Sequence, residues 1–86
     1  MADVHVSRQA VHDLERLPKL YLPAAAAALR GLGPAPLSGR PLAGDLTGLR
    51  SSRIGMYRIV YRFDPRSGVV DVVWIRHRRE AYRRAR

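Results

Sequence analysis

Two strand-like runs joined by a short turn constrain the fold of this 86-residue chain more than any other feature. Residues 56–63 and 69–77 are rich in Val, Ile, Tyr and other residues that favour β-strands. The segment between them reads Asp-Pro-Arg-Ser-Gly, a composition typical of turns, so the two runs predict a β-hairpin. Arginines interrupt both runs, and a guanidinium is costly to bury without a partner. We therefore expect these arginines to be functional, and a phosphate backbone is the ligand that they fit best.

The residues before and after this hairpin predict the rest of a small α+β domain. Ser7 is a suitable N-cap for a first helix that ends at Pro18, and Pro23 suits the first turn of a second helix. Glycines and prolines between 31 and 48 predict an extended connection without regular structure. In chain order we expect strands at 3–6, 48–54, 56–63 and 69–77, with the two helices after the first strand and a short helix at 79–84. This β-α-α-β-β-β-α order predicts a single domain over 1–86, an antiparallel-rich twisted sheet with the helix hairpin packed on one face.

Positive charge is concentrated in the second half of the chain. Residues 49–86 carry eleven arginines and three acidic residues, a net charge of +8, whereas residues 1–48 carry a net charge of only +1. Such an asymmetric field is typical of polyanion binding, although a partner with acidic side chains would fit the same surface.

Composition excludes several classes of protein. The chain has no cysteine, so disulfides, zinc fingers and thiol chemistry are excluded. Its three scattered histidines and few carboxylates form no metal-binding pattern, and we expect no metal or other cofactor. No apolar run approaches the roughly 20 residues of a membrane helix, and the chain does not begin with a signal-peptide pattern. We therefore expect a cytoplasmic protein without a membrane partner.

Strand alternation predicts where the arginines point, because alternate residues of a strand share a face. In the strand at 56–63 the aromatic residues face the helices, which places Arg58 on the open face. In the next strand, strict alternation predicts one face with Val70, Val72, Trp74, Arg76 and Arg78, and the other with Asp71, Val73, Ile75 and His77. We expect Arg58 and Arg78 to converge across the sheet. Arg50 and Arg53, on the preceding strand, add a third side to this cluster.

Two motifs carry a resemblance to a known family. The first, Arg-x-Gly-x-Tyr-Arg-x-x-Tyr, runs from Arg53 to Tyr61, and the second, His-Arg-x-x-x-Tyr, runs from His77 to Tyr82. Together with the N-terminal helix hairpin, they make the chain resemble the RelE toxins of the RelE/ParE superfamily over nearly its whole length. The resemblance implies a RelE-like fold and a toxin of a type II toxin–antitoxin system. It further implies an enzyme, an endoribonuclease that enters the ribosomal A site and cleaves the mRNA there without a metal.

The same resemblance implies roles for single residues. Arg58 matches the family's central catalytic arginine and would stabilise the phosphorane formed when a ribose 2′-OH attacks the neighbouring phosphorus. Arg78 matches the second catalytic arginine and would hold the scissile phosphate or the leaving oxygen. His77 is assigned as general acid or base, and Tyr82 would stack on or orient a base of the codon. The expected RNA-binding set is completed by arginines that could each instead belong to a solvated basic face: Arg50, Arg53, Arg62, Arg76 and Arg79.

Purely structural roles compete with these assignments. Arg58 could instead pair with Asp71 or with the C-terminal carboxylate. His77 could simply bond a backbone carbonyl, and Tyr82 could pack in the core. The chain also departs from the family pattern, because Arg76 stands where glycine often precedes the His-Arg pair, and the lysines that some relatives offer as bases are missing. If His77 is not the base, the sequence names no other.

Expected partners and competing functions follow from the resemblance. RelE-type toxins are held by a small antitoxin, and an acidic amphipathic segment that folds on binding would suit the basic half of this chain. The mRNA on the ribosome, with ribosomal RNA around it, is the other expected partner. Two alternatives stay open: a ParE-like toxin that inhibits DNA gyrase without catalysis, and a degenerate module that binds only RNA or its antitoxin.

Overall fold

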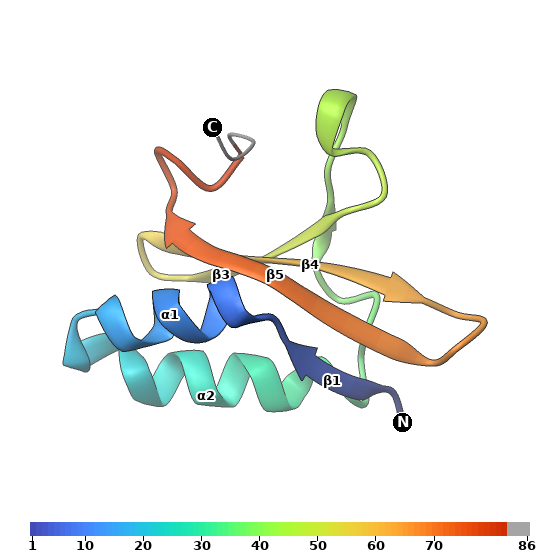
Figure 1. The fold of residues 1–86 in the computed structure, drawn as a ribbon, viewed down its shortest axis with the longest axis horizontal. Helices are drawn as coiled ribbons and strands as arrows, with labels where there is room; N and C mark the ends of the chain where they lie inside the picture. The colour runs from blue at the N-terminus through green and yellow to red at the C-terminus, as the bar shows by residue number, and fades with distance from the viewer. Residues whose placement is uncertain (83–86) are drawn as a thin grey trace.

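A computed structural model describes residues 1–82 and shows a five-stranded mixed sheet with two helices on one face (Figure 1). The elements in chain order, with η for a 3₁₀ helix, are β1 (Asp3–Val6), α1 (Arg8–Arg16), η1 (Lys19–Tyr21), α2 (Leu22–Gly31), β2 (Arg40–Pro41), η2 (Gly44–Leu46), β3 (Arg50–Ile54), β4 (Tyr57–Asp64) and β5 (Val69–His77). The strand order is β1-β5-β4-β3-β2, in which β1 and β5 are parallel and the other neighbours are antiparallel. The predicted α+β domain with a helix hairpin on one face of the sheet is confirmed.

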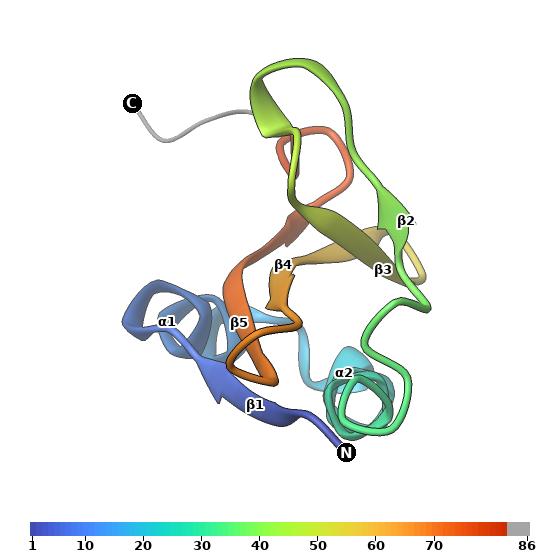
Figure 2. The same cartoon turned by 90° about the vertical axis from the view of Figure 1, so that its right-hand side faces the viewer.

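The two helices begin and end close to the residues expected from the sequence. The Ser7 hydroxyl oxygen accepts a hydrogen bond from the Ala10 amide at 3.0 Å, which caps α1. Pro18 follows the C-cap of α1, and Pro23 lies in the first turn of α2. Both helices lie below β3, β4 and β5 in the view of Figure 1, and in the turned view of Figure 2 α1 lies beside β5 whereas α2 lies below β3. Across residues 1–82, no helix has the length and apolar character needed to cross a bilayer.

Two segments differ from the prediction. The connection between α2 and β3 is not wholly irregular, because β2 pairs with the first residues of β3 and η2 follows it. Residues 79–82 form hydrogen-bonded turns and not a helix. The amides of Glu80 and Ala81 both donate to the His77 carbonyl oxygen, and the pattern does not continue as a helix through Tyr82. The rest of the predicted terminal helix, at 83–84, lies outside the described residues.

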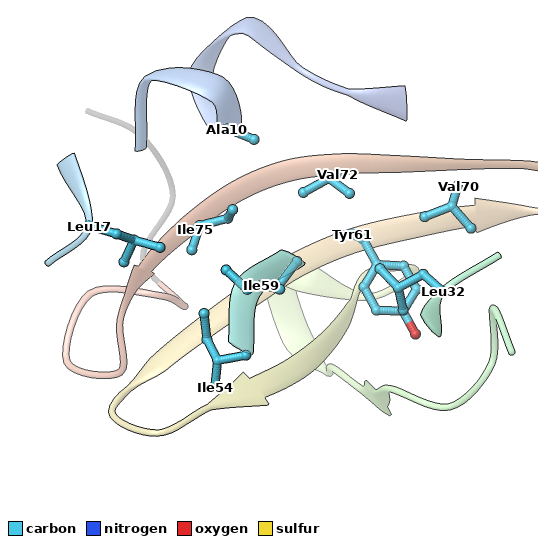
Figure 3. Close-up of a cluster of buried hydrophobic side chains, with 10 residues drawn as sticks. Ala10, Leu17, Leu32, Ile54, Ile59, Tyr61, Val70, Val72 and Ile75 are labelled. Atoms are coloured by element: carbon cyan, nitrogen blue, oxygen red, sulfur yellow. The ribbon is translucent and has the colours of Figure 1, made fainter. Parts of the chain in front are cut away.

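The main core lies between the helices and the sheet. Ile59 and Tyr61 of β4 are fully buried there, next to Leu32 at the end of α2 (Figure 3). The Tyr61 hydroxyl donates to the Pro36 carbonyl oxygen and accepts from the Gly39 amide, each at 2.9 Å. A side-chain carbon on Gly39 would overlap the Tyr61 ring, so glycine is needed for this close approach. These contacts fix the connection that follows α2 against the underside of the sheet.

A β-bulge divides β5 and shifts by one residue the alternation of its side chains between the two faces of the sheet. Val60 and Tyr61 of β4 lie opposite Trp74 and Val72 of β5, so Val73 is an extra residue between two pairs. Val72 therefore packs against the helices, whereas Trp74 packs on the opposite face. The prediction of strict alternation, which puts these two side chains on one face, is wrong beyond the bulge.

A second, smaller core covers part of the open face of the sheet. Val60 and Trp74 are buried there, packed with Leu46 of η2 and Ala81 of the C-terminal turns. The Trp74 indole N–H donates to the Ala81 carbonyl oxygen, which ties the C-terminal turns to the sheet. In Figure 1 both covering segments rise above the sheet, on the side opposite the helices.

Candidate nucleic-acid interface

Three arginines lie side by side across the open face of the sheet. Arg53 of β3 is the Cα partner of Arg58 of β4, and Arg58 is the partner of Arg76 of β5. Directly opposed residues on neighbouring strands project to the same face, and here it is the face on which Val60 and Trp74 pack. We call these three residues the arginine row. Like charges in direct opposition destabilise a sheet, so the row forms a positive strip that an anion would relieve.

Arg58 is held at the β3–β4 turn. Its Nη1 donates to the carbonyl oxygens of Gly55 and Tyr57 at 3.1 Å each, and its side chain is half-buried. Gly55 is the first residue of a two-residue turn and has a φ of +62°, a conformation that favours glycine. A side-chain carbon on Gly55 would also lie 2.8 Å from the Tyr21 ring. The motif glycine therefore lets the turn close against η1 and supply a carbonyl that orients Arg58.

Arg76 lies over an aromatic ring. Its guanidinium carbon is 4.4 Å from the centroid of the Trp74 ring, which is cation–π geometry. Trp74 is itself buried and fixed by the indole hydrogen bond to the Ala81 carbonyl oxygen. The ring therefore orients the guanidinium of Arg76, whose planar fork of donors suits a phosphate.

The C-terminal turns bring Arg78 and Tyr82 to the same region. The Arg78 amide donates to the Met56 carbonyl oxygen at 2.7 Å, so Arg78 lies beside the turn that also holds Arg58. The Arg78 side chain is exposed. The Tyr82 hydroxyl is 3.1 Å from the Ser51 Oγ, and Tyr82 remains 40% exposed. An exposed aromatic ring thus lies next to the arginine row, at the open face of β3.

His77 faces away from the arginine row. It is the Cα partner of Tyr57, and the two rings meet edge to face on the helix side with centroids 5.5 Å apart. Tyr21 of η1 packs against Tyr57 in turn, with centroids 4.9 Å apart. Nδ1 of His77 accepts a hydrogen bond from the Arg79 amide at 3.3 Å, which assigns the proton of the neutral ring to Nε2. In this arrangement the other ring nitrogen is a donor, which suits holding a phosphate and does not suit accepting a proton.

Arg50 and Arg79 lie apart from the arginine row. Arg50 points to the opposite face, where its Nη1 donates to the carbonyl oxygens of Leu37 and Gly39 at 3.2 and 2.8 Å. The prediction that Arg50 and Arg53 form one side of a cluster is wrong, because their odd spacing in β3 places them on opposite faces. Arg79 is exposed in the C-terminal turns.

The aspartate considered as a partner for Arg58 lies elsewhere. Asp71 is the Cα partner of Arg62, and Nη2 of Arg62 is 3.9 Å from Oδ2 of Asp71. The alternative in which Asp71 pairs with Arg58 is therefore wrong. Within the part of the chain that the structure describes, no three His, Asp or Glu side chains gather as ligands for a metal ion.

The sequence interpretation missed two residues that shape this site. Ser51 anchors the Tyr82 hydroxyl, and Trp74 supports Arg76 from below. A serine in a strand gives no signal of such a contact. The support from Trp74 depends only on spacing within one strand, since residues 74 and 76 are two positions apart, both beyond the bulge, and therefore share a face. That signal was present in the spacing alone.

A helix hairpin beneath a sheet whose open face carries three aligned arginines defines a small basic domain that presents guanidinium groups to an anionic partner. The family model described as ParE toxin of type II toxin–antitoxin system, parDE, matches residues 4–82. Toxin RelE of Mycobacterium tuberculosis is 37% identical over 82 residues, covering 93% of this chain and 84% of that protein. Toxin RelG of the same organism is 37% identical over 83 residues, covering 94% and 95%.

A solved structure agrees with these sequence matches. The toxin–antitoxin complex RelBE2 from Mycobacterium tuberculosis contains a chain that is 33% identical, with a TM-score of 0.81, covering 88% of this chain and 96% of that chain. The protein therefore belongs to the RelE/ParE superfamily of type II toxin–antitoxin toxins.

Proposed function

We propose that this toxin is a ribosome-dependent endoribonuclease that cleaves mRNA in the A site. The observation that carries the proposal is the arginine row, because guanidinium groups aligned on one face suit the repeated acceptors of a phosphate backbone. Tyr82 adds an exposed ring beside the row, and proteins that bind single-stranded RNA combine basic grooves with stacked aromatic side chains. The proposal places the protein in the cytoplasm, where mRNA meets ribosomes.

The proposed reaction is the attack of a ribose 2′-oxygen on the adjacent phosphorus. The 2′-oxygen–phosphorus bond forms, the bond to the 5′-oxygen breaks, and the products are a 2′,3′-cyclic phosphate and a 5′-hydroxyl end. Arg58 would stabilise the charge of the phosphorane, a contribution of about 10²–10³ in rate. Arg78 would hold the scissile phosphate or the leaving oxygen, while Arg53 and Arg76 hold neighbouring phosphates. Tyr82 would stack on or orient a base of the codon.

His77 enters the proposal as a donor and not as the base. In the neutral ring Nδ1 accepts from the Arg79 amide, which leaves the Nε2–H to donate a hydrogen bond to a phosphate. The imidazolium form gives up the bond to the Arg79 amide, because both ring nitrogens are then donors, and would donate its Nε2 proton to the leaving 5′-oxygen. Proton donation of this kind contributes about 10²–10⁴ in rate. In this proposal the proton of the attacking 2′-OH passes to water.

We also propose a protein antitoxin as the resting partner of this toxin. The similar RelBE2 structure is a toxin–antitoxin complex. The net charge of +8 on residues 49–86 would attract an acidic segment that folds on binding. Such an antitoxin, added at a stoichiometric ratio, should stop RNA cleavage. Cleavage that continues in the purified complex contradicts this regulation.

Mapping of new 5′ ends on an mRNA held by programmed ribosomes tests the endonuclease. The wild-type protein should cut within the A-site codon, and Arg58→Ala should slow the cut by about 10²–10³ at equal magnesium concentration. Arg66→Ala is the matched control, because it removes the same charge from an exposed position in the β4–β5 turn. An intact message, with the protein folded and free of antitoxin, contradicts the proposal.

Gyrase inhibition is the second candidate function, and one observation favours it. His77 packs on the helix side of the sheet, so the residue expected to transfer protons is not on the face of Arg58. A toxin that only binds its target needs no such residue, and the matching family model is that of the ParE toxin. A DNA supercoiling assay separates the two candidates. Inhibited supercoiling together with an intact A-site codon would favour gyrase as the target.

A further inference from the structure

The outer edge of β5 changes its hydrogen-bonding partner at the bulge. β1 pairs with β5 only as far as Val72. From that point the start of α1 supplies the hydrogen bonds to this edge, and the Ser7 amide donates to the Val72 carbonyl oxygen at 3.0 Å. The Ser7 hydroxyl donates to the carbonyl oxygen of Val73, the extra residue of the bulge, at 2.8 Å. The residue that caps α1 thus also holds one side of the bulge.

Asp13 of α1 holds the other side of the bulge. Its Oδ2 accepts a hydrogen bond from the Ile75 amide at 2.9 Å, and its Oδ1 accepts one from the Gln9 side chain at 2.8 Å. Asp13 is half-buried, and these two bonds orient its carboxylate towards β5. A backbone amide at the edge of the sheet, beyond the reach of β1, is therefore satisfied by a helix side chain.

The bulge decides which residues of β5 face the arginine row. With Val73 as the extra residue, Trp74 and Arg76 project to the open face, and Ile75 and His77 project to the helix side. A strand without the extra residue would exchange these two sets, because a shift of one residue turns every side chain to the other face. Arg76 would then point to the helices and could not lie beside Arg58.

We propose that Asp13 is a positioning residue that keeps Arg76 in the arginine row by holding the bulge of β5. Asp13 lies on the helix side and acts through the backbone of Ile75, so it touches no RNA itself. The part of this inference that concerns RNA rests on the proposed function. The part that concerns the bulge does not, so the two can fail separately.

Three variants isolate the hydrogen bond to Ile75. Asp13→Ala removes both acceptor oxygens, and Asp13→Asn keeps an amide oxygen for the Ile75 amide. Glu15→Ala removes an exposed carboxylate from the same helix and is the matched control. Hydrogen exchange at the Ile75 amide measures the bond directly, and the fluorescence of Trp74, the single tryptophan, reports on the facing of β5.

The expected effect is local and depends on the acceptor oxygen. In Asp13→Ala the Ile75 amide should exchange about tenfold faster or more, because a partly buried donor loses its partner. The Trp74 emission should change in wavelength, because the indole leaves the small core on the open face. Asp13→Asn and Glu15→Ala should stay close to the wild-type values in both measurements.

The salt dependence of binding to a short single-stranded RNA is a further measurement, and a merely structural role of Asp13 would leave it unchanged. Loss of one phosphate contact lowers the slope of log affinity against log salt concentration by about one. Asp13→Ala should show this smaller slope, and so should Arg76→Ala. The double variant should show no further decrease, because both changes remove the same guanidinium from the row.

Several outcomes would overturn the inference. Unchanged exchange at Ile75 in Asp13→Ala does so, and so does equal acceleration of every core amide, which would show general destabilisation. Exchange in Asp13→Asn as fast as in Asp13→Ala does so as well, since the acceptor oxygen would then not matter. If Asp13→Ala fails to fold, Gln9→Ala, which frees only Oδ1, must accelerate Ile75 selectively by a smaller factor. If Asp13→Ala shows the local effect but the wild-type protein binds no RNA, the result contradicts the RNA contacts of the proposed function and supports the role of Asp13 at the bulge.

Discussion

The open face of the sheet carries two cross-strand rows of polar residues that differ in charge. The arginine row lies at the end of the β3–β4 turn and holds three cations. Towards the other end, His5 of β1, Asp71 of β5 and Arg62 of β4 are in register, and we call them the mixed row. A hollow of about 710 Å³ opens beside the mixed row. This hollow therefore borders the self-neutralising row, whereas the arginine row carries the charge that a polyanion needs.

The two rows differ in their effect on the sheet: the mixed row contributes to its stability, whereas the arginine row offers charge for binding. In the mixed row Asp71 lies opposite Arg62, and such an exposed pair contributes roughly 0–1 kcal/mol to stability. In the arginine row the same cross-strand geometry sets like charges against one another, which costs stability. A row that weakens the fold is the row to which a function should be assigned, because binding sites commonly trade stability for activity.

The largest expected effect is on growth arrest, when the arginine end of the face, which is the arginine row together with Arg78, is altered. Arg58→Ala and Arg78→Ala should each slow the proposed mRNA cleavage by about 10²–10³ and so relieve growth arrest, because each removes a cation proposed to hold the reacting phosphate. Arg62→Ala, in the mixed row, should reduce it far less. The growth rate after induction, at matched protein levels, measures this. Growth arrest that survives both of the first two substitutions would remove the catalytic role of the arginine end.

A second, smaller effect concerns the salt dependence of RNA binding. Arg53→Ala and Arg76→Ala should each lower the slope of log affinity against log salt concentration by about one, as expected for the loss of one phosphate contact. Arg62→Ala should change the slope by a smaller amount, since Asp71 neutralises part of its charge. Fluorescence anisotropy of a labelled RNA across a salt series measures the slope. Equal slopes for all three variants would show that the two rows do not differ in binding.

The smallest effect is on stability, and its sign distinguishes the rows. Arg53→Gln should raise the free energy of unfolding by a few tenths of a kcal/mol, because it relieves repulsion from Arg58. Arg62→Gln should lower it by a similar amount, because it removes the partner of Asp71. Urea denaturation at low salt measures both changes, and added salt should shrink them. Changes of the same sign would show that charge pairing within the rows is not what separates them.

Much of the fold could be predicted from the sequence because its signals are local. Ser7 caps the first helix, Pro18 follows its end, and the turn at 64–68 joins two strands, the first of which turns its aromatic residues towards the helices. Each of these features depends on residues within a few positions of one another. The terminal helix predicted at 79–84 is wrong over 79–82, because tertiary contacts hold those residues in turns.

The candidate site was harder to predict because it depends on contacts between distant segments. The bulge at Val73 is held by the start of α1, where Ser7 lies 66 positions from its partner on β5, and the strand itself gives no sign of it. Strict alternation therefore put His77 and Asp71 together on one face, which the bulge prevents. The placement of Arg50, in contrast, was available from the period of two in β3, since residues 50 and 53 must face opposite ways.

The short strand β2 has a consequence for how this sheet meets other chains. Exposed sheet edges are templates on which further strands can add, and long unprotected edges lead to aggregation. β2 contains only two residues, and one of them is Pro41, which has no amide hydrogen to offer a neighbour. At the opposite edge, the side chains of α1 occupy the backbone groups that β1 does not reach. The β2 edge and the part of β5 that extends beyond β1 are thus blunted by proline and by side chains at and after the start of α1. This protection persists at salt concentrations that screen the repulsion between basic surfaces.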